Sequence, residues 1–313
     1  LSISNYAFAK ETKFEKRLQK DIKKLSKISG FIDDDLNLYG EDEITDKKNT
    51  IVIIFNHGQQ DGQKKVERCN KGAADVPEFI RNLHNKEVNG LKIKIYRMCS
   101  GVRGLNDPQM DRTHNMIEKD GNTNGLLEIV DYDGMRLFDK VKQHLRRQIV
   151  LDRIDELTEK NFSNIVLMGH SCGAFLSIYL SAHFPEKIKA SIVTNPACYG
   201  ENISPRNVIG DKNTYSIWKV LRDDWELTIS KFSEINTLAF IHDEDPFENS
   251  ETLSFLGKID KFKMINYTDF GCKKMVGTTF HSSASYPQKD NCFAKWEAKN
   301  NYIINYLGEF FEN

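Results

Sequence analysis

Residues 165–177 read Ile-Val-Leu-Met-Gly-His-Ser-Cys-Gly-Ala-Phe-Leu-Ser. The first four are a short apolar run, typical of a strand that is buried on both faces of a parallel sheet. Gly169 and Gly173 flank Ser171, and a sharp turn from a strand into a helix requires small residues at both flanking positions. The stretch therefore predicts a strand, a tight turn and a helix, with the Ser171 hydroxyl above the sheet and the N-terminus of the helix pointing at it.

Further apolar runs alternate with helical patterns on both sides of this stretch. Strands are expected at residues 31–39 (one or two short strands), 50–55, 91–98, 164–168, 190–194, 237–242 and 262–267. Helices are expected at residues 10–28, 134–160, 174–183, 223–235 and 295–311. This alternation indicates an α/β fold, in which a mostly parallel central sheet is flanked by helices on both faces. Residues 10–313 are expected to form one domain.

The composition is that of an ordinary soluble domain. The 44 basic and 45 acidic residues leave a net charge of −1, so nothing indicates a nucleic-acid partner. No apolar run approaches the roughly 20 residues that a membrane-spanning helix needs. The eight histidines are scattered, without the spacing of a metal site, and no metal or other cofactor is expected.

Two features concern the compartment. Residues 1–9 end in Ala7-Phe8-Ala9, and small residues at these two alanine positions are what signal peptidase accepts. We therefore expect residues 1–9 to be the residual tail of a signal peptide. The six cysteines are an even number, as in disulfide-bonded proteins, although six buried thiols in a cytosolic enzyme are the alternative. Together these features predict a periplasmic or secreted protein.

A serine hydroxyl is a poor nucleophile near neutral pH, so Ser171 needs a histidine as general base. Three histidines follow it in the chain. His183 lies at the end of a predicted helix, and His242 ends a predicted strand. His281 is expected in a loop between the last strand and the last helix, where the base belongs, and is our candidate.

The base in turn needs an orienting acid, expected just beyond the strand at 237–242. That turn holds three carboxylates. Asp245 is preferred, because the turn must leave the strand before it can face His281, and Pro246 makes it rigid there. Asp243 is the second candidate, and Glu244 is expected to be a solvated turn residue.

When a serine attacks a carbonyl carbon, the tetrahedral intermediate carries an oxyanion. Two backbone N–H donors are needed to stabilise it. The first is expected from Cys172, which follows the candidate nucleophile. The second is expected from Gln59, in the loop after the strand at 50–55, where Gly58 lets the backbone approach a substrate. His57 and His170 adjoin these positions and are expected to line the substrate loop.

These motifs resemble the α/β-hydrolase superfamily, and most of all its exported esterase and dienelactone-hydrolase-like members, over roughly residues 31–311. The resemblance implies a cofactor-free Ser–His–Asp enzyme that cleaves a small-molecule or polymeric ester through an acyl-enzyme on Ser171. The family's acid turn usually has Gly where Asp243 stands, which leaves the choice of acid open. No large cap domain is expected, and residues 100–133 are the candidate lid. The residues that match are Asn56-His57-Gly58, Gly169–Gly173, Asn195-Pro196-Ala197, Asp245-Pro246 and His281.

The cysteines are interpreted as structural. Disulfides are predicted for the pairs Cys69–Cys99 and Cys272–Cys292, which would brace the loops of the oxyanion donor and of the base. Cys172 and Cys198 follow consecutive strands and form either a third pair or free buried thiols.

Two other functions remain open from the sequence. An acyltransferase would use the same residues but transfer the acyl group to an alcohol instead of water. A non-catalytic binding protein is compatible with the same fold, because fold does not dictate function. Neither the substrate nor the oligomeric state is predicted.

Overall fold

The computed structural model describes residues 12–58, 69, 75–103, 142–199, 212–272, 279–285 and 291–311. Residues 1–11, Gln59 and most of the candidate lid at 100–133 lie outside this set.

Nine strands of the described residues form one sheet in the order β2-β1-β5-β3-β6-β7-β8-β9, with β4 paired to β5 outside this path. Strands β5, β3, β6, β7, β8 and β9 are parallel to one another. β1, β2 and β4 pair antiparallel at one end. The mostly parallel sheet is as predicted. The strands are β1 (Gly30–Ile32), β2 (Leu38–Tyr39), β3 (Thr50–Asn56), β4 (Glu87–Val88), β5 (Leu91–Met98), β6 (Asn164–Ser171), β7 (Ala190–Pro196), β8 (Glu234–Ile241) and β9 (Asp260–Asn266).

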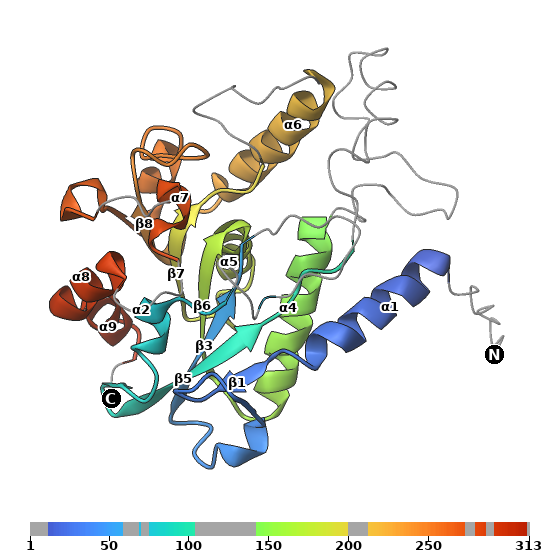
Figure 1. Cartoon of the computed structure of the whole chain (residues 1–313), viewed down its shortest axis with the longest axis vertical. Helices are drawn as coiled ribbons and strands as arrows, with labels where there is room; N and C mark the ends of the chain where they lie inside the picture. Colours follow the sequence, from blue (N-terminus) through green and yellow to red (C-terminus); the bar gives the residue numbers. More distant parts are fainter. Residues whose placement is uncertain are drawn as a thin grey trace.

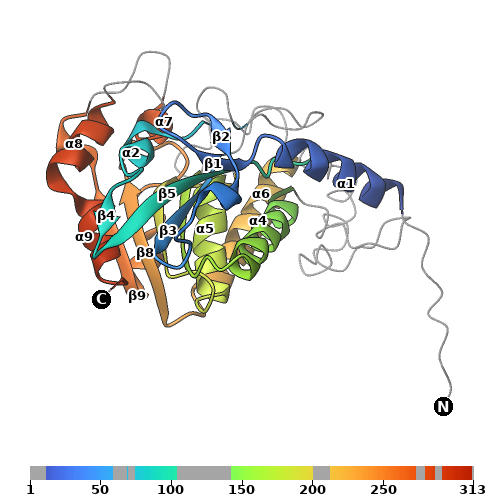
Figure 2. The same ribbon diagram turned by 90° about the horizontal axis from the view of Figure 1, so that it is seen from below.

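Helices cover both faces of this sheet (Figures 1 and 2). α1, α4, α5 and α6 contribute buried side chains to the cores on one face, and α2, α8 and α9 pack on the other. The helices are α1 (Lys13–Ser26), α2 (Glu78–Arg81), α4 (Lys142–Glu159), α5 (Cys172–His183), α6 (Lys212–Ile229), α7 (Phe280–Ser283), α8 (Cys292–Asn300) and α9 (Tyr302–Gly308). Short 3-10 helices lie at η1 (Glu41–Glu43), η7 (Ser254–Lys258) and η8 (Thr268–Phe270).

Strand β3 shows why the apolar runs are continuous. Its side chains alternate between the two faces, with Ile51, Ile53 and Phe55 in the core under α2, α8 and α9. Val52 and Ile54 lie in the core under α1, α4 and α5. Because both faces are covered, every position of β3 is buried and apolar residues are favoured throughout.

Helix α1 is held at its N-terminus and at Asp21. The Thr12 hydroxyl accepts from the Glu15 N–H at 3.1 Å, and the Glu15 carboxylate accepts from the Thr12 N–H at 2.7 Å, which is a capping box. Further along, the buried Asp21 carboxylate pairs with Arg103 at 2.6 Å. The helix predicted at 10–28 is α1, and its apolar face packs on the sheet.

Two predicted helices were wrong in extent. The C-terminal helix expected at 295–311 is instead two helices, α8 and α9, which meet at Asn301. Asn301 has a left-handed backbone (φ 52°), a conformation that ends a helix and that asparagine tolerates. The helix expected at 223–235 is α6, which begins at Lys212 and ends at Ile229. α2, α7 and β4 were not predicted, because elements of two to four residues leave no periodic pattern.

All six cysteines pair in three disulfides, Cys69–Cys99, Cys172–Cys198 and Cys272–Cys292, with Cα–Cα distances of 5.5, 4.3 and 5.5 Å. Two of these pairs were predicted. The third resolves the alternative left open for Cys172 and Cys198. Among the described helices, none is long and apolar enough to cross a membrane.

Candidate active site

Ser171 occupies the turn between β6 and α5, as predicted. Its backbone lies in a region of φ and ψ that residues other than glycine rarely adopt (φ 56°, ψ −125°). The two flanking glycines are required by close backbone contacts. A Cβ at Gly169 would lie 2.3 Å from the Gly173 carbonyl oxygen, and a Cβ at Gly173 would lie 2.0 Å from the Asn56 carbonyl oxygen. The turn therefore cannot hold larger residues at either position.

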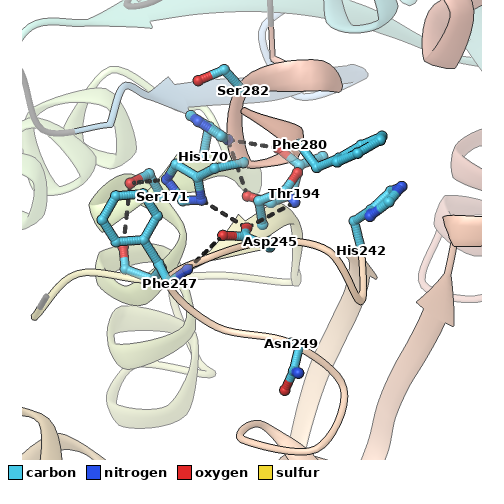
Figure 3. A network of polar contacts seen from close by, with 12 residues as sticks. His170, Ser171, Thr194, His242, Asp245, Phe247, Asn249, Phe280 and Ser282 are labelled. Carbon is cyan, nitrogen blue, oxygen red and sulfur yellow. Dashed lines mark hydrogen bonds and ion pairs between the residues drawn. The ribbon is translucent and has the colours of Figure 1, made fainter. Parts of the chain in front are cut away.

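Three side chains from different elements meet at the carboxyl end of the sheet. His281 Nε2 lies 2.8 Å from Ser171 Oγ, and His281 Nδ1 lies 2.7 Å from Asp245 Oδ2. The chain of contacts from Ser171 to Asp245 and on to Phe247 is drawn in Figure 3. Since an ionised carboxylate only accepts, the His281 proton lies on Nδ1, and Nε2 accepts from the serine hydroxyl. The arrangement can remove a proton from Ser171.

Asp245 is fully buried, and each of its oxygens accepts a hydrogen bond. Oδ1 accepts from the Phe247 N–H at 2.9 Å, and Oδ2 accepts from the Asn195 amide at 3.0 Å as well as from His281. These donors hold the carboxylate toward the imidazole.

The other two acids of the turn lie elsewhere. The Asp243 carboxylate accepts from the Ser250 hydroxyl and from the Asn266 amide. The bond from Ser250 holds the pKa of Asp243 below its usual range. Glu244 has an exposed side chain. Of the three carboxylates, Asp245 is the one in contact with His281.

The histidines are placed nearly as predicted, with one correction. His281 lies not in a loop but on the one-turn helix α7, which turns its ring toward Ser171. His183 stacks on Tyr179 with ring centroids 3.9 Å apart, at the far end of α5 from Ser171. His242 stacks on Phe280 at 4.0 Å, and Figure 3 shows both rings apart from the contacts between Ser171 and Asp245.

A supporting layer that the sequence did not predict lies behind Asp245. The Tyr267 hydroxyl donates to Asn195 Oδ1 at 2.7 Å and lies 3.0 Å from Ser283 Oγ on α7. Burial raises the pKa of Tyr267, so the phenol stays neutral and able to donate. The Asn195-Pro196 pair at the end of β7 was the available signal, because side chains at the ends of parallel strands converge on one edge.

The oxyanion donors are described in part. Cys172 begins α5, so its N–H points out of the helix N-terminus. Gln59 lies outside the described residues. Its neighbour Gly58 is directly beside Ser171, since a Cβ there would be 3.0 Å from Ser171 Cβ. The His57 carbonyl accepts from Arg146 Nη2 at 2.5 Å.

His57 and His170 are both buried at this site. His57 Nδ1 lies 2.6 Å from the Gly58 carbonyl oxygen, and His170 Nδ1 lies 3.2 Å from the Thr194 carbonyl oxygen. Burial lowers the pKa of each ring well below its usual value, so both are neutral at pH 7. The centroid of the His170 ring is 5.0 Å from that of the His281 ring.

The disulfide Cys172–Cys198 lies directly beside Ser171. Cys172 follows Ser171, and Cys198 follows Ala197, whose carbonyl oxygen lies 3.3 Å from Ser171 Oγ. The bond therefore ties the turn at Ser171 to the segment after β7.

No protein-family model matches the sequence, and a search of curated proteins finds no match. Among solved structures, the chain is similar to Est1E from Butyrivibrio proteoclasticus, with 14% identity over 84% of this chain and 90% of that chain (TM-score 0.44). It is similar to a monoglyceride lipase from Saccharomyces cerevisiae, with 10% identity over 86% and 90% (TM-score 0.44). A dienelactone hydrolase from Anabaena variabilis shares 12% identity over 84% and 85% (TM-score 0.38). The predicted fold class is confirmed by the topology, because a mostly parallel sheet is flanked by helices on both faces and its strand β6 leads into the strand–turn–helix that holds Ser171.

Proposed function

We propose that this protein is a serine hydrolase that cleaves a carboxylic ester through an acyl-enzyme on Ser171. The observation that supports it most is the pair of contacts on one imidazole, 2.8 Å to Ser171 Oγ and 2.7 Å to Asp245 Oδ2. A nucleophile, a general base and an orienting acid need these contacts.

In the first half-reaction, Ser171 Oγ attacks the ester carbonyl carbon while its proton moves to His281 Nε2. The carbonyl oxygen becomes an oxyanion, which the N–H groups of Cys172 and Gln59 bind. Asp245 favours the imidazolium that forms, because its carboxylate is buried against the ring. Collapse of the intermediate breaks the ester C–O bond, and His281 gives its proton to the leaving alkoxide.

In the second half-reaction, His281 takes a proton from water, and the resulting hydroxide attacks the acyl carbon. The acid leaves, and the proton returns to Ser171 Oγ. An alcohol in place of water would make the same residues an acyltransferase, so the acceptor is part of the proposal. We propose water.

We infer further that the protein works in an oxidising compartment, either periplasmic or extracellular. Three disulfides within one chain support this, because cytosolic thiols are kept reduced.

The test is hydrolysis of nitrophenyl esters of increasing acyl chain length, with the Ser171→Ala variant as control. We expect the variant to lose at least about 10³-fold in kcat while it keeps its circular dichroism spectrum. A fluorophosphonate should add once to the wild type and not to the variant. Near-normal turnover by the variant would contradict the proposal, and absence of both turnover and labelling in the wild type would favour a binding protein. Ester products in the presence of alcohol would favour an acyltransferase.

A further inference from the structure

A fully buried arginine on α4 has no carboxylate partner among the described residues. The three hydrogen bonds of Arg146 go to neutral acceptors, namely Ser100 Oγ at 3.0 Å, Gln143 Oε1 at 3.1 Å and the His57 carbonyl oxygen at 2.5 Å. The other two buried arginines in the described ranges, Arg97 and Arg222, each pair with a carboxylate.

A buried charge without an opposite charge destabilises a fold, because it gives up its hydration for weaker contacts. Burial lowers the pKa of Arg146 to about 10, which still leaves the guanidinium charged at neutral pH. A leucine or methionine would fill the same volume at no such cost. The charge of Arg146 is therefore better explained by a role in function than by a contribution to the stability of the fold.

The position of the His57 carbonyl indicates that role. It belongs to the peptide that leads into Gly58, and a Cβ added at Gly58 would lie 3.0 Å from Ser171 Cβ. The same carbonyl oxygen would lie 2.6 Å from a Cβ added at Gly173. The acceptor of Arg146 thus lies close to Gly58 and Gly173, next to the turn that holds Ser171 and Cys172.

A peptide unit is planar, so fixing the His57 carbonyl also fixes the direction of the Gly58 N–H, in the residue directly before Gln59. Gly58 has no side chain that could hold this loop, and its backbone is more permissive than that of any other residue. The hydrogen bond from Arg146 is therefore a contact that orients the His57–Gly58 peptide from within the protein.

We propose that Arg146 is a positioning residue of the oxyanion site, which holds the His57–Gly58 peptide in place and whose charge favours the tetrahedral intermediate over the neutral ester. Among the described residues no carboxylate faces Arg146, and during the reaction a negative charge appears on the substrate. In a buried site such a charge acts over several ångströms with little screening. This inference rests on the proposed function, because it assigns a role within that reaction.

The test compares three variants on the ester that the wild type hydrolyses best. Arg146→Met removes the charge, Arg146→Lys keeps the charge but not the planar fork, and Arg97→Met is a matched control for the loss of a buried arginine. A trifluoromethyl ketone serves as the probe of the oxyanion site, because Ser171 Oγ adds to its carbonyl carbon and the proton moves to His281, which leaves an oxyanion on the adduct.

For Arg146→Met we expect a fall of about 10- to 100-fold in kcat, less than the loss of a direct oxyanion donor, with KM changed by less than about threefold. Affinity for the trifluoromethyl ketone should fall by the same factor as kcat. Arg146→Lys should recover part of both losses, and the acidic limb of the pH profile should stay in place, because the contacts of His281 are intact. Arg97→Met should change kcat by less than about threefold.

The inference is overturned if folded Arg146→Met keeps wild-type kcat, if kcat falls without loss of ketone affinity, or if Arg97→Met is equally impaired. If Arg146→Met does not fold, Arg146→Lys and Ser100→Ala test the inference instead. Each keeps the positive charge but weakens the contacts through which Arg146 holds the His57–Gly58 peptide. Matched losses of kcat and ketone affinity support the inference, and unchanged values overturn it. Activity that survives Ser171→Ala would overturn the proposed function itself, whereas Ser171-dependent activity that is insensitive to Arg146 would overturn this inference alone.

Discussion

The side-chain amide of Asn195 donates to Oδ2 of Asp245 at 3.0 Å, the same oxygen that contacts His281. Asn195 has a left-handed backbone (φ 46°), and its other amide atom accepts from Tyr267 at 2.7 Å. The amide is therefore held from behind with its N–H₂ group facing the carboxylate. This relationship makes Asn195 part of the support for the candidate acid.

We expect Asn195→Leu to lower kcat by about tenfold, since a hydrogen bond to a charged group contributes roughly 1.5–3 kcal/mol and only part of it acts on the reaction. Tyr267→Phe should cost about threefold, because it removes a hydrogen bond that acts on Asp245 only through the amide. Both variants should change kcat more than KM in ester hydrolysis. Asn236, which donates to the Lys189 carbonyl at 3.0 Å on an exposed surface, offers the control Asn236→Leu. Equal losses in all three would contradict a positioning role.

The second prediction separates the carboxylates of the acid turn. Asp245→Asn should lower kcat by on the order of 10²–10⁴, because an amide at this position favours the wrong tautomer of His281. Asp243→Asn and Glu244→Gln should each cost less than tenfold, since neither side chain contacts the histidine. Steady-state kinetics of the three variants decide the assignment. A crippled Asp243→Asn beside a mild Asp245→Asn would show that the assignment of the acid is wrong, without affecting the role of Ser171.

The residues of this site could be predicted where the chain carries a local signal. Ser171 lies between Gly169 and Gly173, where an added Cβ would be 2.3 and 2.0 Å from backbone oxygens. The turn therefore requires glycine at both positions, and this pattern can be recognised in the sequence. Asp245 and His281 follow from chain order in the fold together with the few candidates that remain after Ser171. To predict either residue, it was enough to know which strand it follows.

Asn195 and Arg146 could not be predicted in their roles, because their partners are distant in sequence. Arg146 is 89 residues from His57, and Asn195 is 50 residues from Asp245. Nothing near Arg146 in the sequence marks it as buried, since α4 carries charged residues on most of its turns. The break at Asn301 was missed for a similar reason, because apolar residues recur at helical spacing on both sides of it.

The third prediction concerns pH and two of the buried histidines, His57 and His170. Burial lowers the pKa of both in the folded state, whereas the unfolded value is about 6.5. Below pH 6.5 the unfolded chain therefore binds protons that the folded chain does not, and the free energy of unfolding falls as pH falls. The expected slope is about 1.4 kcal/mol per pH unit for each ring once the unfolded histidine is fully protonated.

Denaturant unfolding at pH 7.5, 6.5 and 5.5 measures this slope, in a range above the titration of carboxylates. His170→Gln should reduce it by close to one proton, because glutamine does not titrate. A free energy of unfolding that does not change between pH 6.5 and 5.5 would show that neither ring is kept neutral by the fold.

The last prediction concerns the order in which the three disulfides are reduced. Exchange requires that a thiolate reach a sulfur atom, so access controls the rate in the native protein. Cys172 and Cys198 are 2% and 7% exposed, and Cys69 and Cys99 are 0% and 1% exposed, whereas Cys292 is exposed. A graded treatment with dithiothreitol, followed by iodoacetamide and mass spectrometry, should therefore label Cys272 and Cys292 first. Reduction of Cys172–Cys198 should coincide with loss of the native fold, because this bond closes a 26-residue separation that spans α5 and β7 and contributes roughly 3–4 kcal/mol. Labelling of Cys172 and Cys198 in protein that remains folded and active would show that the bond neither stabilises the core nor supports the turn at Ser171.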